Sequence, residues 1–385
     1  MSNDFFSRMT TENRSGGLGG SIKGILLGIF LFIVSFPLLW WNEGRSVELY
    51  NSLVEGQKLV ISVSSQTIKP ANNGQLVHTQ GLAMTEEVLQ DEPFNVFATA
   101  IKLSRHVTMY QWQENKTTET TEKRGGSRET KITYTYSQEW HDTYIDSKKF
   151  NNTEYHNPPI IYPNKTLQAT QVKLGAYQLN TQQIKKINQK IPLSLHNSHP
   201  PALLANKKLT LVGNELYLGF DTNNPEIGDM RINFQVVNAT TISLIAQQQD
   251  NHFLAYQTEA GSPIDLLKLG LMDATALFNA EHRENTVITW AVRFGGAFIM
   301  WWGLVIIFKP AAVLGRIIPI LGDLISMGTK VFAFLITLPC AMLTIALAWV
   351  AYRPLLAMGL ITIAVLAIIA IKLISDKKFR GISTQ

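Results

Sequence analysis

Apolar residues gather in a few long runs, and the first of these runs has sharp polar borders. It extends from Gly24 to Trp41 without an ionisable residue and is followed at once by Asn42-Glu43-Gly44-Arg45. A helix of this length rises about 27 Å, close to the roughly 30 Å hydrocarbon core of a bilayer. Indole rings settle where hydrocarbon meets water, so Trp40 and Trp41 are typical of the end of a membrane helix. The pattern predicts a transmembrane span over 24–41.

Three further apolar runs lie in the C-terminal part and predict spans over 291–308, 331–352 and 355–372. Between the first two of these runs, residues 309–330 are apolar but are interrupted by glycines and a proline. This segment is expected to be interfacial or re-entrant rather than a regular span. Basic residues lie at the edges of the runs, where long side chains can reach the headgroups: Arg293, Lys309, Arg353 and Lys372.

Residues 42–290, between the first and second spans, have the patterns of a folded α+β domain that is rich in strands. Apolar positions alternate over 229–237, which is typical of a half-buried strand. Helices are expected to begin at Thr181 and at Ser262-Pro263, where a capping residue precedes a proline at the first helical position.

The clearest local signal in this domain is a long β-hairpin over 109–140. Threonines, tyrosines and charged residues alternate on both sides of a glycine-rich turn. A turn centred on Gly126 would place Trp112 opposite Trp140 across the two strands. Cross-strand aromatic pairs stabilise hairpins by roughly 0.2–1 kcal/mol each.

Composition agrees with a membrane protein that carries a sizeable polar domain. Charged residues make up 16% of the 385 residues, against about 25% in soluble domains. The single cysteine, Cys340, excludes a disulfide within the chain and a cysteine-based zinc site. The expected fold is a multi-pass α-helical membrane protein with four spans, one N-terminal and three C-terminal. A large strand-rich α+β extracytosolic domain is inserted between spans 1 and 2.

The short polar segments predict which side of the membrane each part faces. Basic residues cluster in the Gly-rich tail 1–23, in 309–330 and in the tail 373–385. Cytosolic loops carry an excess of Lys and Arg, and four spans allow all three clusters to be cytosolic. Both termini are then cytosolic, and residues 42–290 lie in the periplasm or in an organelle lumen.

The sequence resembles the transmembrane protein 43 family, also called LUMA, over nearly its whole length. The resemblance rests on the order and spacing of six stretches: LLWWNEGR (38–45), GQLVH (74–78), MYQW (109–112), IGDMR (227–231), IPILG (318–322) and AWVAYRPL (348–355). It implies a non-enzymatic protein of the endoplasmic reticulum and inner nuclear membrane. Animal members self-associate and organise the nuclear envelope with lamins and emerin. Bacterial members lack such partners, so an inner membrane with a periplasmic domain would apply to them. The family has no accepted catalytic residues, and none are transferred.

Candidate chemistry is sparse along the chain. A phosphate-binding loop is excluded because no strand precedes the N-terminal glycine cluster and no Gly-Lys-Ser/Thr follows it. The glycines around a hydrolase serine and the second histidine of a zincin helix are missing as well. No catalytic residue, cofactor, metal or nucleic-acid partner is therefore expected. In 309–330, Arg316 and Asp323 are seven residues apart and share a helical face if Pro319 permits. They are the polar face of an interfacial helix or, alternatively, part of an ion pathway.

Two hypotheses of function follow. The first is a membrane scaffold whose domain binds itself and other proteins, with the lipid bilayer as its environment. The alternative is an oligomeric ion channel or channel regulator that uses Arg316 and Asp323. Gly20, Gly24 and Gly28 recur every four residues as a stripe of small residues that allows close helix approach, and a homo-oligomer is expected to use this stripe. The alternative is that these glycines ease membrane insertion and have no partner helix.

Overall fold

The structure is a computed structural model that describes residues 5–12, 17–122, 128–196, 198–314, 319–354, 358–359 and 362. The chain divides into two compact units. The strand-rich unit comprises Met1–Ser15, Leu59–Tyr256 and Ile264–Leu277. The helical unit comprises Gly16–Lys58, Gln257–Pro263 and Phe278–Gln385.

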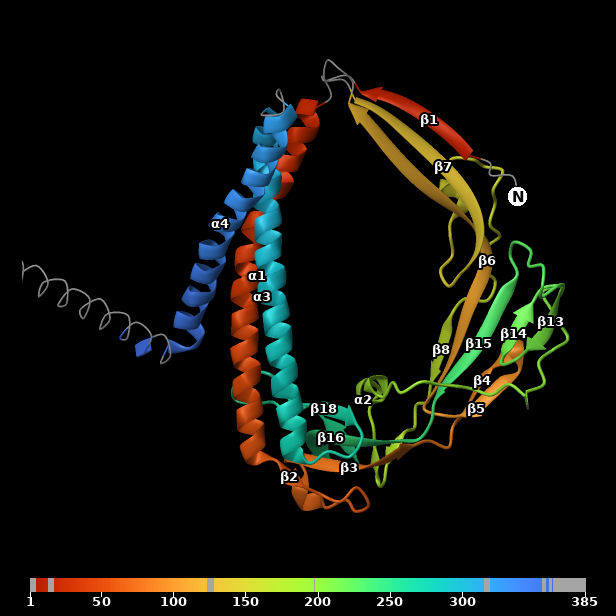
Figure 1. Ribbon diagram of the computed structural model, residues 1–385. Coiled ribbons are helices and arrows are strands. Elements are labelled where there is room, and N and C mark those ends of the chain that lie inside the picture. Colours follow the sequence, from red (N-terminus) through yellow and green to blue (C-terminus); the bar gives the residue numbers. More distant parts are fainter. Residues whose placement is uncertain are drawn as a thin grey trace, which may run out of the picture. The chain divides into compact units, whose positions relative to one another are not determined.

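Three long helices form the helical unit: α1 (Gly17–Leu59), α3 (Ala274–Leu314) and α4 (Pro319–Tyr352) (Figure 1). Each contains a stretch that is long and apolar enough to cross a membrane. Three of the predicted spans are therefore confirmed as apolar helices. The fourth, 355–372, lies almost entirely outside the described residues.

The helices extend beyond the predicted spans. α1 does not end at Trp41 but continues to Leu59, and α3 already begins at Ala274. The polar residues after Trp41 therefore belong to the first helix and not to the domain. Segment 309–330 is likewise no separate element, because its described residues form the last turns of α3 and the first turns of α4. Its interfacial or re-entrant position stays a prediction.

Within the described residues, the larger sheet of the strand-rich unit has nine strands in the order β1-β7-β6-β15-β14-β13-β12, with β8 beside β6 and β11 beside β15. Their bounds are β1 Phe5–Glu12, β6 Lys102–Glu122, β7 Arg128–His141, β8 Lys165–Gln168, β11 Ile191–Pro192, β12 Leu203–Leu204, β13 Lys207–Val212, β14 Glu215–Leu218 and β15 Met230–Val237. The predicted alternation in β15 is confirmed. Met230, Ile232, Phe234 and Val236 are buried in one core cluster, against Val107 and Met109 of β6 and other residues.

A second sheet of seven strands, counted over the same residues, has the order β18-β16-β17-β10-β9-β3-β2, and β16 also pairs with β3. Its strands are β2 Ile61–Ser62, β3 Leu76–Met84, β9 Lys173–Leu174, β10 Tyr177–Gln178, β16 Thr240–Gln249, β17 His252–Leu254 and β18 Leu266–Leu269. A separate hairpin joins β4 (Val88–Asp91) to β5 (Val96–Thr99). Buried Val77, Leu244 and Phe253 belong to a second core cluster, together with Ile184 of helix α2 (Thr181–Lys186).

Two local predictions need correction. The long hairpin exists as β6 and β7, but Trp140 lies opposite Tyr110, and Trp112 lies opposite Gln138. A turn centre one residue earlier moves every cross-strand partner by two, which keeps each side chain on its face. The helix predicted at Ser262-Pro263 is absent from the described chain, because β18 follows there and α3 begins later.

Strand β1 lies within the Gly-rich tail 1–23. Phe5 lies opposite Thr135 and Glu12 opposite Arg128, so residues 5–12 pair with β7 of the strand-rich unit. The chain from Glu12 to Gly17 reaches at most about 18 Å, which is too short to cross a bilayer. A sheet with open edges cannot lie in hydrocarbon. The β1 pairing favours a tail on the side of the domain, whereas the basic residues favour the opposite side, and the orientation of the tail stays a prediction.

Candidate functional site: a buried polar junction of three helices

Polar side chains are buried where the apolar run of α1 ends. Leu39, Asn42 and Glu43 have no exposed surface, and Ser46 is almost as buried. These positions recur every three or four residues and so share one face of a helix. The apolar stripe of α1 thus continues as a polar stripe on the same face, and this stripe needs hydrogen-bond partners from neighbouring helices.

Glu43 is the centre of the junction. Arg293 of α3 binds it in a bidentate pair, with Nε 2.6 Å from Oε1 and Nη2 2.7 Å from Oε2. The indole Nε1 of Trp349 in α4 also donates to Oε2, at 2.8 Å. One carboxylate therefore joins α1, α3 and α4. Bidentate, charge-assisted bonds of this kind are the strongest hydrogen bonds that side chains offer.

Aromatic rings shield this ion pair. The Arg293 guanidinium lies 4.8 Å from the centre of the Trp290 ring and 5.7 Å from that of Trp349. Cation–π contacts of this geometry contribute roughly 0.5–2 kcal/mol, more where water is excluded. The Arg293 side chain is thus turned to Glu43, and its expected position at the headgroups stays a prediction.

A ladder of further hydrogen bonds continues the contact between α1 and α3. Asn42 Nδ2 donates to the Thr289 carbonyl at 3.1 Å, and Asn285 Nδ2 donates to the Ser46 carbonyl at 2.9 Å. Arg45, which is half-buried, donates to Thr289 Oγ1 at 3.3 Å. These bonds hold the two helices together over the polar turns that follow the apolar run.

The end of α4 packs on the same turn of α1. Trp40 Nε1 donates to the Tyr352 hydroxyl at 3.1 Å, and the two rings meet edge to face. A Cβ atom on Gly44 would lie 2.7 Å from Cζ of Tyr352, so any larger residue here would force the Tyr352 ring to move. Arg353 directly follows, and its N–H donates to the Trp349 carbonyl. Trp41 remains exposed, and its position at a membrane interface stays a prediction.

The small-residue stripe of α1 has its partner within the same chain. A Cβ atom on Gly28 would lie 2.7 Å from the Gly303 carbonyl oxygen, and one on Gly303 would lie 2.8 Å from the Gly28 oxygen. Such distances mean that the backbones of α1 and α3 are in direct contact here. A Cβ atom on Gly24 would only touch Ile306, at 3.9 Å. The structure thus uses Gly28 for packing against α3, where the sequence analysis assigned it to contact between copies.

The part of α1 that follows Trp41, residues 42–59, is its polar extension. It also binds the loop Gln257–Pro263 of the helical unit. Glu55 accepts hydrogen bonds from the backbone N–H groups of Glu259 and Ala260, at 3.0 and 3.2 Å. Ser52 and Thr258 share a buried hydrogen bond of 2.8 Å. The extension is thus a docking surface for the chain's own loop.

The border formed by Trp40, Asn42, Glu43 and Arg45 is visible in the sequence, whereas the partners that the fold brings to these residues are not. Trp349 and Tyr352 belong to a stretch singled out by family resemblance, without a role. A carboxylate directly after an apolar helix face is itself a signal, because a buried carboxylate requires a cation from another segment. Arg316 and the side chain of Asp323 lie outside what the structure describes, and their role stays a prediction.

Comparison with known proteins shows the family of this chain. A family model described as "Transmembrane protein 43" matches residues 109–354. Transmembrane protein 43 of Rattus norvegicus is 33% identical over 90% of this chain and 88% of the relative. The human protein is 32% identical over the same shares, and a Drosophila melanogaster homolog is 28% identical over 86% and 89%. No solved structure matches the chain. The chain therefore belongs to the transmembrane protein 43 family.

Proposed function

We propose that this protein is a non-enzymatic membrane scaffold whose strand-rich domain binds itself and other proteins. The observation that carries the proposal is the junction at Glu43. Both oxygens of its carboxylate are bound by partners from two other helices. The charges in this part of the helical unit therefore join helices. A stable set of membrane helices is what a membrane-attached binding domain requires.

The alternative, an oligomeric channel or channel regulator, needs ionisable groups that face a water-filled route. Glu43 and Arg293 neutralise each other and are shielded by aromatic rings, so they do not serve such a route. The candidates that remain for it are Arg316 and Asp323. The scaffold is preferred because the described contacts support a structural use of charge.

Reconstitution distinguishes the two functions. The full chain in liposomes is expected to give no ion flux beyond that of empty liposomes. Chemical cross-linking of the same liposomes should capture copies of the chain through its domain. A protein-dependent flux that Asp323→Asn abolishes, while a matched Asp273→Asn variant leaves it unchanged, would replace the scaffold by the channel.

For localisation we propose that both termini are cytosolic and that the strand-rich domain lies in a lumen or periplasm. The three basic clusters support this orientation, and the fourth predicted span is needed to return the C-terminus to the side of the N-terminus. In a eukaryotic cell the membrane would be the endoplasmic reticulum and inner nuclear envelope, with lamin- or emerin-type partners. In a bacterium it would be the inner membrane, without those partners.

Glycosylation in a eukaryotic cell tests this orientation. Asn-x-Ser/Thr acceptors are modified only on the luminal side, in accessible segments. The central acceptors Asn115, Asn151, Asn164 and Asn238 are all exposed. Asn238 is the most favourable, because it lies in the turn between β15 and β16. We expect a glycan on Asn238, lost in Asn238→Gln, and none on Asn13 of the tail.

The acceptor Asn13 distinguishes the two orientations of the N-terminal tail. The basic residues favour one orientation, and the pairing of β1 with β7 favours the other. Absence of a glycan on Asn13 agrees with the basic residues and with an α1 that crosses the bilayer. Glycans on both Asn13 and Asn238 would place the tail beside β7, on the side of the domain. A glycan on Asn13 with none on any central acceptor would invert the orientation and rule out a luminal scaffold.

A further inference from the structure

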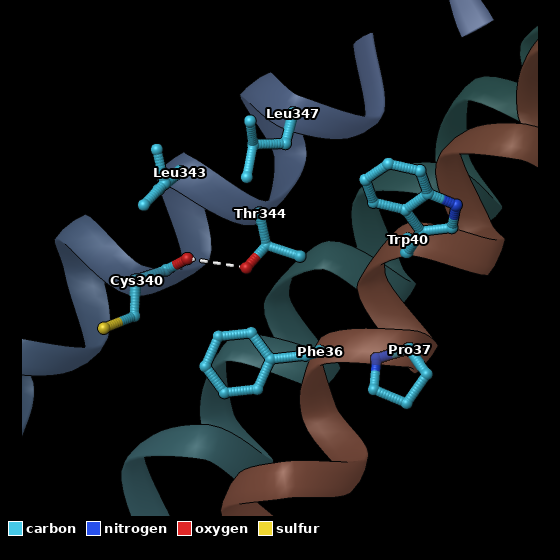
Figure 2. Close-up of a pocket in the computed structure, with 7 residues that line it drawn as sticks. All are labelled: Phe36, Pro37, Trp40, Cys340, Leu343, Thr344 and Leu347. Carbon is cyan, nitrogen blue, oxygen red and sulfur yellow. Dashed lines mark hydrogen bonds between the residues drawn. The ribbon is translucent and has the colours of Figure 1, made fainter. Parts of the chain in front are cut away.

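A groove between α1 and α4 lies beside the polar junction. It has a volume of about 370 Å³, near the lower end of the roughly 300–1,000 Å³ of ligand pockets. Phe36, Pro37 and Trp40 line it from α1 (Figure 2). α4 contributes the other wall: Cys340, Leu343, Thr344 and Leu347. All of these residues lie in the helical unit.

The groove offers almost no hydrogen-bonding group to an occupant. The Thr344 hydroxyl donates to the Cys340 carbonyl at 2.7 Å, as Figure 2 shows. The Trp40 N–H is bound to the Tyr352 hydroxyl. A stable water needs two to four polar partners, and a polar ligand or an ion needs more. The occupant must therefore be hydrocarbon where it touches these walls.

Prolines lie in both helices at this level, Pro37 in α1 and Pro339 in α4 next to Cys340. A proline inside a helix removes one backbone hydrogen bond and bends the helix axis. Each proline therefore weakens regular side-chain packing along its own helix near the groove. The closely packed layer of Leu39, Met300 and Ala341 lies next to the groove and does not fill it.

The polarity around the groove indicates how an occupant is oriented. Its Trp40 end is one turn from the Glu43–Arg293 pair, and Arg353 follows the end of α4. The opposite end continues among apolar residues of both helices. This arrangement is complementary to a molecule with a hydrocarbon chain and an anionic or zwitterionic headgroup at one end. The headgroup would lie beside Arg353.

We propose that the groove between α1 and α4 binds one acyl chain of a bilayer phospholipid, with the headgroup at the Trp40 and Arg353 end. The bilayer supplies this ligand at high concentration to helices that are apolar enough to span it. Leu343 and Leu347 are half exposed along the open side, so the chain enters sideways from the membrane. The site is independent of the scaffold proposal and holds whichever function the domain has.

The test uses the full chain in nanodiscs that contain a phosphatidylcholine with a photoactivatable diazirine on its acyl chain. We expect labelled peptides from both walls, around 36–40 and 340–347, in severalfold excess over other exposed parts of α4. Leu343→Trp fills the groove and should abolish this excess. Leu338→Trp is the matched control, because Leu338 is an exposed leucine of α4 that does not line the groove. It should leave the labelling unchanged.

Three results would overturn the proposal. Equal labelling of the groove in both tryptophan variants would mean that lipid contacts the helices without a site. Labelling of the outer face of α4 without the groove peptides would mean that protein, from a second copy or from the C-terminal residues, fills the groove. A labelled free fatty acid that competes fully with the phospholipid would assign the site to that ligand instead. Unchanged thermal unfolding of both variants serves as the control for folding.

Discussion

Neutralising Glu43 alone should destabilise the helical unit more than removing both charges of the Glu43–Arg293 pair. Glu43→Gln leaves the Arg293 guanidinium buried without a counter-ion. Loss of one partner of a buried pair costs about 3–5 kcal/mol, whereas replacing both partners together is often close to neutral. In Glu43→Gln/Arg293→Met both charges are gone, and the glutamine oxygen still accepts from the Trp349 indole. The double variant should therefore unfold at higher temperature than either single variant in detergent or nanodiscs.

A carboxylate on the surface of the same helix provides the control. Glu48 is exposed and accepts a hydrogen bond from the Ser262 hydroxyl. Glu48→Gln should change the unfolding free energy by less than about 1 kcal/mol, as is usual for exposed charged groups. If the effects of Glu43→Gln and Arg293→Met simply add in the double variant, the two groups do not stabilise each other, and the junction does not join the helices as described.

The parts of the fold that sequence predicts well are those that depend on local pattern and length. An uninterrupted apolar run such as 24–41 satisfies its own backbone hydrogen bonds as a helix, so no other segment is needed to define it. Strand β15 was also predictable, since the alternation of Met230, Ile232, Phe234 and Val236 directly reflects one buried face. In both cases the residues that decide the structure are neighbours in the chain.

The junction could not be predicted in the same way. Glu43 and Arg293 are 250 positions apart, and Trp349 is 306 positions from Glu43. Nothing in the local sequence indicates which cation meets the buried carboxylate, because that choice depends on how α1 and α3 pack. The glycine contact between Gly28 and Gly303 is hidden for the same reason. A stripe of small residues predicts close approach and leaves the partner open.

The wrong local predictions have a related cause. Ser262-Pro263 has good capping chemistry, yet the next residues pair with β16, where Ile245 lies opposite Leu266. Ladder hydrogen bonds and burial of the strand outweigh a cap that contributes only about 1 kcal/mol. The hairpin register depends on a turn whose centre differs by a single residue, and the residues 123–127 contain more than one position that suits a turn.

Alanine substitutions along the glycine stripe of α1 should have effects of opposite sign. In Gly28→Ala the new Cβ atom would lie 2.7 Å from the Gly303 oxygen and 2.9 Å from Cγ1 of Ile307, so α1 and α3 must separate. Overpacking of this kind costs about 1–3 kcal/mol or more when backbone must move. In Gly24→Ala the nearest atom is 3.9 Å away, and alanine gains roughly 0.5–1 kcal/mol over glycine within a helix.

Unfolding of the purified chain in nanodiscs, followed together with its oligomeric state, distinguishes a contact within the chain from one between copies. A contact of α1 with α3 predicts that Gly28→Ala and Gly303→Ala both lower the unfolding temperature at every protein concentration, while Gly24→Ala leaves it unchanged or raises it. Gly28→Ala with the stability of the natural chain but weakened self-association would show that the stripe faces a second copy. The direct contact of Gly28 with Gly303 would then be wrong, because a buried methyl group cannot occupy the space of a carbonyl oxygen without a loss of stability.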